Sequence, residues 1–193
     1  YPAEILSLEK RGAKVRVVSR IGVGNETPLR IHLYQSIARG EKMDWILQKA
    51  TELGVAAFTP MQSERTEVKL DQERSEQRIG HWQGVIRSAC EQSGRALIPI
   101  LHPPVSINRL EPGSMQQAFY LQPGAGLRIT DLTLSPDLDT ALAIGPEGGF
   151  SERDIRQLQG AGFLGLSLGP RILRTETAGL AGLAALQSRF GDC

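Results

Sequence analysis

Few cysteines, few histidines and almost no net charge set the first limits on what this 193-residue chain does. Cys90 and Cys193 stand far apart and form no Cys-x-x-Cys or Cys/His ligand spacing, so neither a zinc site nor a disulfide framework is expected. So little cysteine favours a reducing cytoplasm as the location. The 22 basic and 21 acidic side chains nearly cancel. Any RNA-binding face therefore has to come from local clustering of charge.

Long apolar runs are missing as well. No run reaches the roughly 18 residues that a membrane span needs, and no signal peptide is visible, so no membrane association is expected. The 40% of hydrophobic and 22% of charged residues are typical of a globular chain. This length suits one domain of roughly 100 to 200 residues with a small appendage.

The N-terminal segment predicts a β-hairpin. Residues 3–8 and 14–19 alternate apolar and polar side chains, and residues 10–13 form the turn between them. The chain begins at Tyr1, in the middle of this β-rich element, and a lone hairpin is marginal in water. We therefore expect residues 1–27 to be the remnant of a larger N-terminal β-domain.

The remaining residues, 28–193, alternate strand-like and helix-like segments. The Gly/Pro-rich link 21–29 leads into them, and a charged loop is expected at 62–71. Strands are predicted at 29–35, 55–61, 96–101, 118–122, 140–145 and 163–169, and helices at 41–54, 72–93, 151–158 and 175–190. This order predicts an α/β domain with a mainly parallel sheet that is covered on both faces.

Two Gly-Pro loops near the C-terminus are the most informative motifs. GPEGGFS (145–151) and GPRILRTET (169–177) each follow a short apolar run and each lead into a helix-like segment. Strand ends that present bare backbone side by side make a pocket for a flat, polar cofactor. The first loop lacks the Lys-Ser/Thr of a phosphate-binding loop, and a tight strand-to-helix turn is the simpler alternative.

The second loop carries apolar side chains at a helix start. Leu168, Ile172 and Leu173 can sandwich a purine while backbone groups read its edge. The alternative is a hydrophobic staple beside an N-cap threonine, with Arg174 solvated. Small residues fill the helix that follows, which allows close packing against a second subunit or within the chain's own core.

A nucleophile-elbow pattern, GLSLG (165–169), does not indicate a serine hydrolase. That mechanism needs a helix directly after the serine and a later histidine, but Gly169-Pro170 follows and every histidine precedes Ser167. Elsewhere, ACEQSGR (89–95) places Glu91 and Arg95 four residues apart. Their pairing on a helix surface is the default expectation.

Long motifs carry a family resemblance: EKMDWILQKATELGV, SERTEVKL, RSACEQSGR, IGPEGGFS and LGPRILRTETAGLAGLAALQSRFGD. The chain resembles the RsmE family of SPOUT-class methyltransferases, which act on N3 of a uridine in 16S rRNA of the small ribosomal subunit. The resemblance implies a parallel α/β sheet with a C-terminal trefoil knot over residues 28–193. It also implies that residues 1–27 belong to a PUA-like, RNA-binding β-barrel. S-adenosylmethionine as cofactor, no metal, and a homodimer with the active site at its interface are implied too.

The resemblance also assigns site residues. The cofactor-binding set is Leu121, Gln122, Pro123, Gly145, Pro146, Glu147, Gly148, Gly149, Leu168, Gly169, Ile172, Leu173, Thr175 and Thr177. The RNA-binding set is Arg65, Gln92 and Arg95, and the catalytic candidates are Arg174, Glu176, Glu91 and Arg65.

The expected chemistry suits these residue types. A sulfonium is an activated methyl donor. The protein therefore has to orient the reactants and stabilise the charge that develops on the uracil imide. An arginine stabilises the negative charge that spreads onto O2 and O4, and a carboxylate accepts the N3 proton. Glu176 and Glu91 both stay open as that carboxylate, because a helix N-terminus lowers the basicity of Glu176. Three alternative functions stay open: a ribose or tRNA-base methyltransferase, a non-catalytic RNA-binding protein, and a nucleotide-dependent enzyme.

Overall fold

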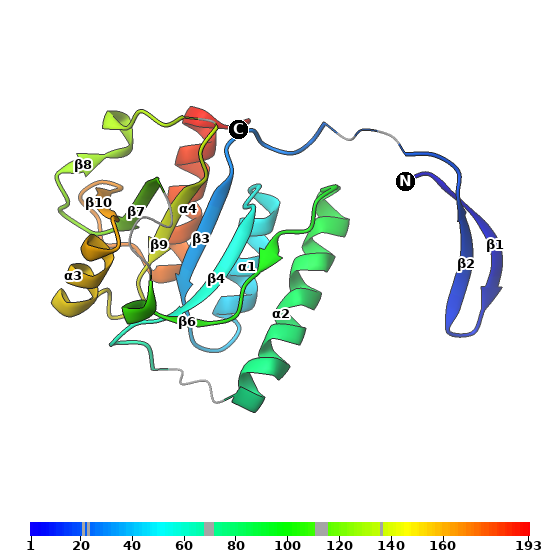
Figure 1. The fold of residues 1–193 in the computed structure, drawn as a ribbon, viewed down its shortest axis with the longest axis horizontal. Coiled ribbons are helices and arrows are strands. Elements are labelled where there is room, and N and C mark those ends of the chain that lie inside the picture. The colour runs from blue at the N-terminus through cyan, green and yellow to red at the C-terminus, as the bar shows by residue number, and fades with distance from the viewer. Residues whose placement is uncertain (21, 23, 68–71, 111–115, 136) are drawn as a thin grey trace.

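The computed structural model describes residues 1–20, 22, 24–67, 72–110, 116–135 and 137–193. The predicted link 21–29 and loop 62–71 therefore lie partly outside the described residues. The N-terminal strands β1 (Ala3–Glu9) and β2 (Gly12–Val17) pair antiparallel and form a sheet of their own, as predicted. Figure 1 shows this hairpin standing apart from the main body. Apolar side chains of the hairpin, such as Ile5 and Leu8, are exposed.

A parallel sheet forms the main body, which confirms the α/β prediction. Its strands run in the order β5-β4-β3-β9-β7-β10-β8, with β6 paired to β4, and every pairing is parallel. The strand bounds are β3 (Ile31–Ser36), β4 (Ala57–Gln62), β5 (Ile100–Leu101), β6 (Val105–Ser106), β7 (Gln117–Leu121), β8 (Leu127–Arg128), β9 (Thr140–Ile144) and β10 (Leu164–Ser167). The central strands β3 and β9 are buried along their whole length, as expected for a sheet covered on both faces.

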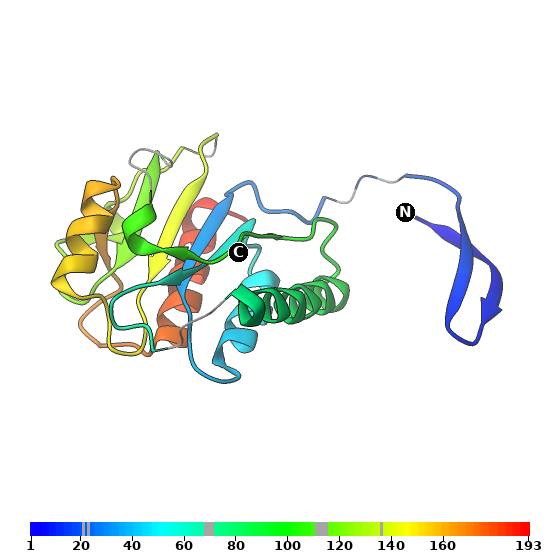
Figure 2. The same ribbon diagram turned by 60° about the horizontal axis from the view of Figure 1, so that its bottom comes forward.

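Helices cover the two faces of this sheet (Figure 2). On one face, α1 (Lys42–Glu52), α2 (Gln72–Ser93) and α4 (Thr175–Phe190) share a core with Ile31 and Leu33 of β3. On the other face, α3 (Glu152–Gly160) and the short 3-10 helix η1 (Ile107–Arg109) enclose a second core around Tyr34. Alternate side chains of β3 therefore pack into the two different cores, because successive residues of a strand point to opposite faces of the sheet.

The small residues of α4 pack against the sheet of the same chain. A Cβ on Gly182 would lie 3.2 Å from side-chain atoms of both Leu121 and Leu142, closer than ordinary contact. A Cβ on Gly179 would lie 3.4 Å from Gln35 Oε1. The chain's own core therefore accounts for these two glycines, so they give no support for a second subunit.

The strand prediction at 96–101 is wrong in a segment that contains and precedes prolines. Residues 96–101 were expected to form one strand, but only Ile100–Leu101 does, and Leu97 and Ile98 are exposed. The segment that follows, for which no strand was predicted, contains β6, a two-residue strand after Pro103 and Pro104. Proline lacks a backbone N–H, so it shortens the ladders on both sides. Strand β8 and the 3-10 helix η2 (Ile129–Asp131) were not predicted at all. Among the described residues, none of the helices has the length and apolarity to span a membrane.

Candidate cofactor and active site

A pocket of about 400 Å³ opens at the carboxyl ends of β7, β9 and β10. Parallel strands end at the same edge of their sheet, and this edge is where open α/β sheets bind ligands. Three chain segments line the pocket: the one after β7, the GPEGGFS loop after β9, and the GPRILRT loop after β10. Its lining residues are Leu121, Gln122, Pro123, Ile144, Gly145, Pro146, Glu147, Gly148, Gly149, Phe150, Ile155, Leu166, Leu168, Gly169, Arg171, Ile172, Leu173, Thr175 and Ala178.

The two predicted glycine loops thus come together, and every predicted cofactor residue except Thr177 lines this pocket. Thr177 is exposed in the first turn of α4. Sequence reasoning missed six lining residues: Ile144, Phe150, Ile155, Leu166, Arg171 and Ala178. Ile144 and Leu166 lie near the ends of the apolar runs that precede the two loops. This position could have identified them as pocket-lining residues. Phe150 packs edge-on against Tyr120, a contact that only the fold reveals.

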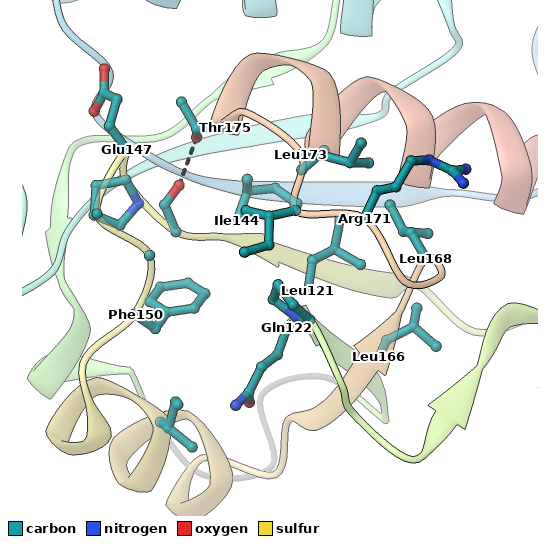
Figure 3. Close-up of a pocket in the computed structure, with 18 of the residues that line it drawn as sticks. Leu121, Gln122, Ile144, Glu147, Phe150, Leu166, Leu168, Arg171, Leu173 and Thr175 are labelled. Atoms are coloured by element: carbon teal, nitrogen blue, oxygen red, sulfur yellow. Dashed lines mark hydrogen bonds between the residues drawn. The ribbon is translucent and has the colours of Figure 1, made fainter.

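A hydrogen-bond chain joins the two glycine loops (Figure 3). The Thr175 hydroxyl donates to the Gly145 carbonyl at 2.6 Å and accepts from the buried Gln35 amide at 3.1 Å. A Cβ on Gly145 would lie 3.1 to 3.3 Å from backbone atoms of Gly149 and Phe150, so the loop backbone would have to move to accept a side chain. The first loop is therefore closed tightly on itself and fixed to the start of α4.

The loop after β4 contacts the GPEGGFS loop through Glu64 and Arg65. Arg65 donates from Nη1 to the Gly148 carbonyl at 2.7 Å. The Ser151 hydroxyl donates to the Glu64 carboxylate at 2.6 Å, and Ser151 caps α3 by accepting from the Asp154 backbone N–H. Ser151 and Asp154 thus form a capping box at the start of α3. These contacts place Arg65 at the loop that lines the pocket, and its RNA contact stays a prediction.

Glu147 points away from the apolar side of the pocket (Figure 3). Its carboxylate accepts from the Arg39 backbone N–H at 3.3 Å and from Lys42 Nζ at 3.4 Å. Burial, the largest single effect, raises the pKa of Glu147, but its hydrogen bonds and the Lys42 charge together hold this pKa below the ordinary value. Glu147 is therefore ionised at neutral pH, and we infer that it shapes the loop.

Arg174 and Glu176 lie where the second loop enters α4. Arg174 is exposed and occupies the N-cap position between the pocket-lining Leu173 and Thr175, without a side-chain capping bond. Glu176 is largely buried, with 17% of its side chain exposed, and lies 3.6 Å from Lys42 Nζ. Both predicted catalytic residues thus lie beside the pocket, while their roles stay predictions. Arg171, which was not predicted, lines the pocket.

Arg95 is a correction to the sequence analysis. The default pairing with Glu91 is wrong, because α2 ends at Ser93 and Gly94 turns the chain with a φ of +72°. Arg95 instead donates to Glu26 at 2.6 Å and to the carbonyls of Thr51 and Val55 at 3.0 and 2.7 Å.

These partners place Arg95 at the amino edge of the sheet, opposite the pocket. Val55 lies two residues before the start of β4, whereas the carboxyl ends of the strands carry the pocket loops. With 7% of its side chain exposed, Arg95 is built into the fold, which argues against the predicted RNA contact. Glu91 and Gln92 are exposed in the last turn of α2 at this same edge. Within a single chain, Glu91 and Gln92 do not line the pocket. Their predicted roles stay predictions.

The pocket suits a flat heteroaromatic ligand with a polar edge. Leu121, Ile144, Leu168 and Leu173 supply apolar walls, and the glycine loops supply backbone N–H and C=O groups (Figure 3). Among the residues that the structure describes, no group of three His, Cys, Asp or Glu side chains is arranged to hold a metal ion. Apolar walls with main-chain hydrogen-bonding groups fit an adenosine-containing cofactor.

Known proteins match both the fold and this loop set. The model of the RNA methyltransferase domain matches residues 25–187. The chain belongs to this RNA methyltransferase family. The ribosomal RNA small subunit methyltransferase E of Buchnera aphidicola subsp. Schizaphis graminum is 36% identical over 194 residues, which cover 98% of this chain and 78% of that protein. The enzyme of the same name from Bacillus subtilis is 30% identical over 192 residues, covering 95% and 75%. The predicted RsmE family is therefore confirmed.

Solved structures agree with the sequence relatives. A methyltransferase from Neisseria gonorrhoeae with the same name, bound to S-adenosyl methionine, has a TM-score of 0.90 and 38% identity, covering 98% of this chain and 78% of that one. A Legionella pneumophila protein described as a methyltransferase, in complex with the bound cofactor SAM, has a TM-score of 0.93 and 44% identity, covering 99% and 79%. Family and fold thus rest on matches over nearly the whole chain.

Proposed function

We propose that this protein uses S-adenosylmethionine to methylate N3 of a uridine in the 16S rRNA of the small ribosomal subunit. The observation that carries the proposal is the pocket formed by the GPEGGFS and GPRILRT loops, which holds nearly all of the predicted cofactor residues. The family match supports RNA as the substrate class. The names of the relatives support the ribosomal small subunit, and two of their structures contain the cofactor.

The chain's own residues divide the work as follows. When bound, S-adenosylmethionine supplies a methyl group already activated by its sulfonium. Leu168, Ile172 and Leu173 hold the apolar part of the ligand, and the loop backbones bind its polar edge. Arg174 stabilises the negative charge that spreads onto the uracil oxygens when N3 loses its proton. Glu176, which lies beside the pocket, accepts that proton in preference to Glu91 at the far edge of the sheet.

Methyl transfer to purified small ribosomal subunits tests the function. Subunits that lack the modification are incubated with protein and labelled cofactor, and the rRNA is digested to nucleosides and analysed by mass spectrometry. We expect label in 3-methyluridine. Label on a ribose or on another base would replace this function with a different methylation. Cofactor binding without any transfer to ribosomal RNA would favour a non-catalytic RNA-binding protein.

Replacing Gly145 with alanine should weaken cofactor binding at least tenfold, about 1.4 kcal/mol. The new Cβ would meet backbone atoms of its own loop, which have to move and thereby displace the pocket wall. Calorimetric titration with S-adenosylmethionine in the presence of a chelator measures the affinity. Gly84→Ala on α2 is the matched control, because its Cβ would meet nothing within 4 Å and Gly84 does not line the pocket. Equal affinities of the two variants would contradict the loop's proposed role.

We also propose the finer fold and assembly that the resemblance implies, a SPOUT-type trefoil knot and a homodimer. The Thr175–Gly145 hydrogen bond agrees with the packing that such a knot requires, since it joins the start of α4 to the GPEGGFS loop. The exposure of Ile172 supports the dimer. This isoleucine lines the pocket, yet 86% of it is exposed, and a second subunit would cover it.

Light scattering coupled to size exclusion should therefore give the mass of two chains at micromolar concentration. Two-fold closed symmetry is the commonest arrangement for soluble oligomers. Ile172→Asp should shift the species toward the monomer, because it places a charge in an apolar contact. A wild-type monomer throughout this range would contradict the dimer.

The hairpin is proposed to be part of an RNA-binding β unit. Lys10, Arg11, Lys14 and Arg16 are exposed on and around its turn. Exchanging Lys10 and Arg11 for glutamate should weaken binding to small subunits and reduce its salt dependence, because phosphate contacts dominate RNA affinity. Filter binding at several salt concentrations measures this effect, while cofactor affinity should stay unchanged. Unaltered RNA affinity would remove the hairpin from the RNA-binding surface.

A further inference from the structure

Lys42, the first residue of α1, lies between carboxylates from two different pocket segments. Its Nζ is 3.4 Å from Oε1 of Glu147 in the GPEGGFS loop and 3.6 Å from Oε2 of Glu176 in the first turn of α4. The Lys42 side chain is about one-third exposed. This ammonium therefore provides a second link between the GPEGGFS loop and the start of α4, in addition to the Thr175–Gly145 hydrogen bond.

The two carboxylates depend on Lys42 to different degrees. Glu147 also accepts a hydrogen bond from the Arg39 backbone N–H. Glu176 Oε2 is buried and, among the described residues, receives no hydrogen bond. A buried carboxylate without a partner is costly, and two neighbouring carboxylates repel each other unless a cation separates them. Lys42 is thus the cation that makes the buried position of Glu176 tenable.

We propose that Lys42 is a positioning residue of the methyl-transfer site: it holds the Glu176 carboxylate beside the pocket and keeps the two cofactor loops in register. The effect on catalysis rests on the proposed function. The structural effect rests only on the contacts of Lys42 with Glu147 and Glu176. An aligned acceptor matters because a misplacement of about 1 Å can lower a rate about 100-fold. Lys42 acts through Glu176 and needs no contact with substrate.

A double-mutant cycle on stability tests the structural link without any activity measurement. Lys42→Met should lower the midpoint of thermal unfolding, because it leaves the buried Glu176 carboxylate unpaired. Adding Glu176→Gln to Lys42→Met should restore much of that loss, since the neutral amide needs no counter-ion. If the two losses simply add, Lys42 does not hold Glu176 and the proposal is overturned.

Single-turnover rates test the catalytic consequence. Lys42→Met should lower the rate of methyl transfer about 10- to 100-fold, with less than a threefold change in cofactor affinity. Lys42→Arg should recover most of the rate, because it keeps the cation. The double variant Lys42→Met/Glu176→Gln should be no slower than the slower single variant. Independent, multiplying losses would overturn the proposal.

Lys49→Met is the matched control, since Lys49 lies on the same helix and pairs with Glu52 at 2.8 Å, remote from the pocket residues. It should leave the rate unchanged. Failure of the proposed function would show differently from failure of this inference. A wild-type protein that binds cofactor but transfers no methyl group would refute the function, while the stability cycle would still decide whether Lys42 holds Glu176.

Discussion

Replacing Arg174 with alanine is expected to lower the rate of methyl transfer about 100- to 1,000-fold, the usual cost of removing one preorganised donor. Arg174 is exposed at the N-cap of α4, between two residues that line the pocket. From there its guanidinium can reach a base presented at the pocket mouth. It does not line the pocket itself, so cofactor affinity should change little. Single-turnover rates and calorimetric titration separate the two effects.

Three further variants sharpen this prediction. Arg174→Lys should recover little of the rate, because an ammonium cannot reproduce the planar, two-pronged contact of a guanidinium. Arg171→Ala removes the arginine that does line the pocket, so it should weaken cofactor binding more than Arg174→Ala does. Arg156→Ala on the surface of α3, where the side chain is 69% exposed, should change neither quantity. Near-normal rates for Arg174→Ala would show that Arg174 is only a solvated cap residue.

Local patterns were enough to predict the two longest helices and the two glycine loops of the pocket. The helices at 72–93 and 175–190 were predicted with the bounds that the structure shows, because their apolar spacing and glycine stop signals are local. The Gly-Pro loops were predicted because glycine and proline after a short apolar run mark the end of a buried strand. Strands of two residues, such as β6, carry too few side chains to produce a periodic signal.

Contacts between distant segments were beyond local reasoning. Nothing in the residues around Lys42 indicates that its ammonium meets Glu147 and Glu176, more than 100 positions away in the chain. The partner of Arg95 is likewise Glu26, 69 positions away. Resemblance to a family marks such residues as shared motifs without separating a structural role from a substrate-binding one.

Replacing Arg95 with alanine is expected to lower the free energy of unfolding by about 3 kcal/mol, near the low end for breaking a buried ion pair. The variant removes two hydrogen bonds to Glu26 and one each to the carbonyls of Thr51 and Val55. The Thr51 carbonyl still accepts from the Gly54 backbone N–H at 3.1 Å. The loss is moderated because Glu26 keeps the backbone N–H groups of Ala96 and Leu97 at 3.0 and 2.9 Å. Chemical denaturation at neutral pH measures it. Arg30→Ala, which breaks the exposed pair with Asp139, should cost less than about 1 kcal/mol.

The pH dependence of this loss distinguishes an ion pair from simple packing. Burial, the largest single effect, raises the pKa of Glu26, but Arg95 and the two backbone N–H groups outweigh it and hold this pKa below the ordinary 4.5. A carboxyl whose pKa is lowered by folding stabilises the folded state above its unfolded pKa, and this contribution is lost as the pH falls through the folded value. The difference between wild type and Arg95→Ala should therefore be largest at neutral pH and shrink below about pH 4.5. A difference that stays constant with pH would assign the loss to packing. A variant as stable as wild type that binds RNA less tightly would restore Arg95 to the RNA-binding surface.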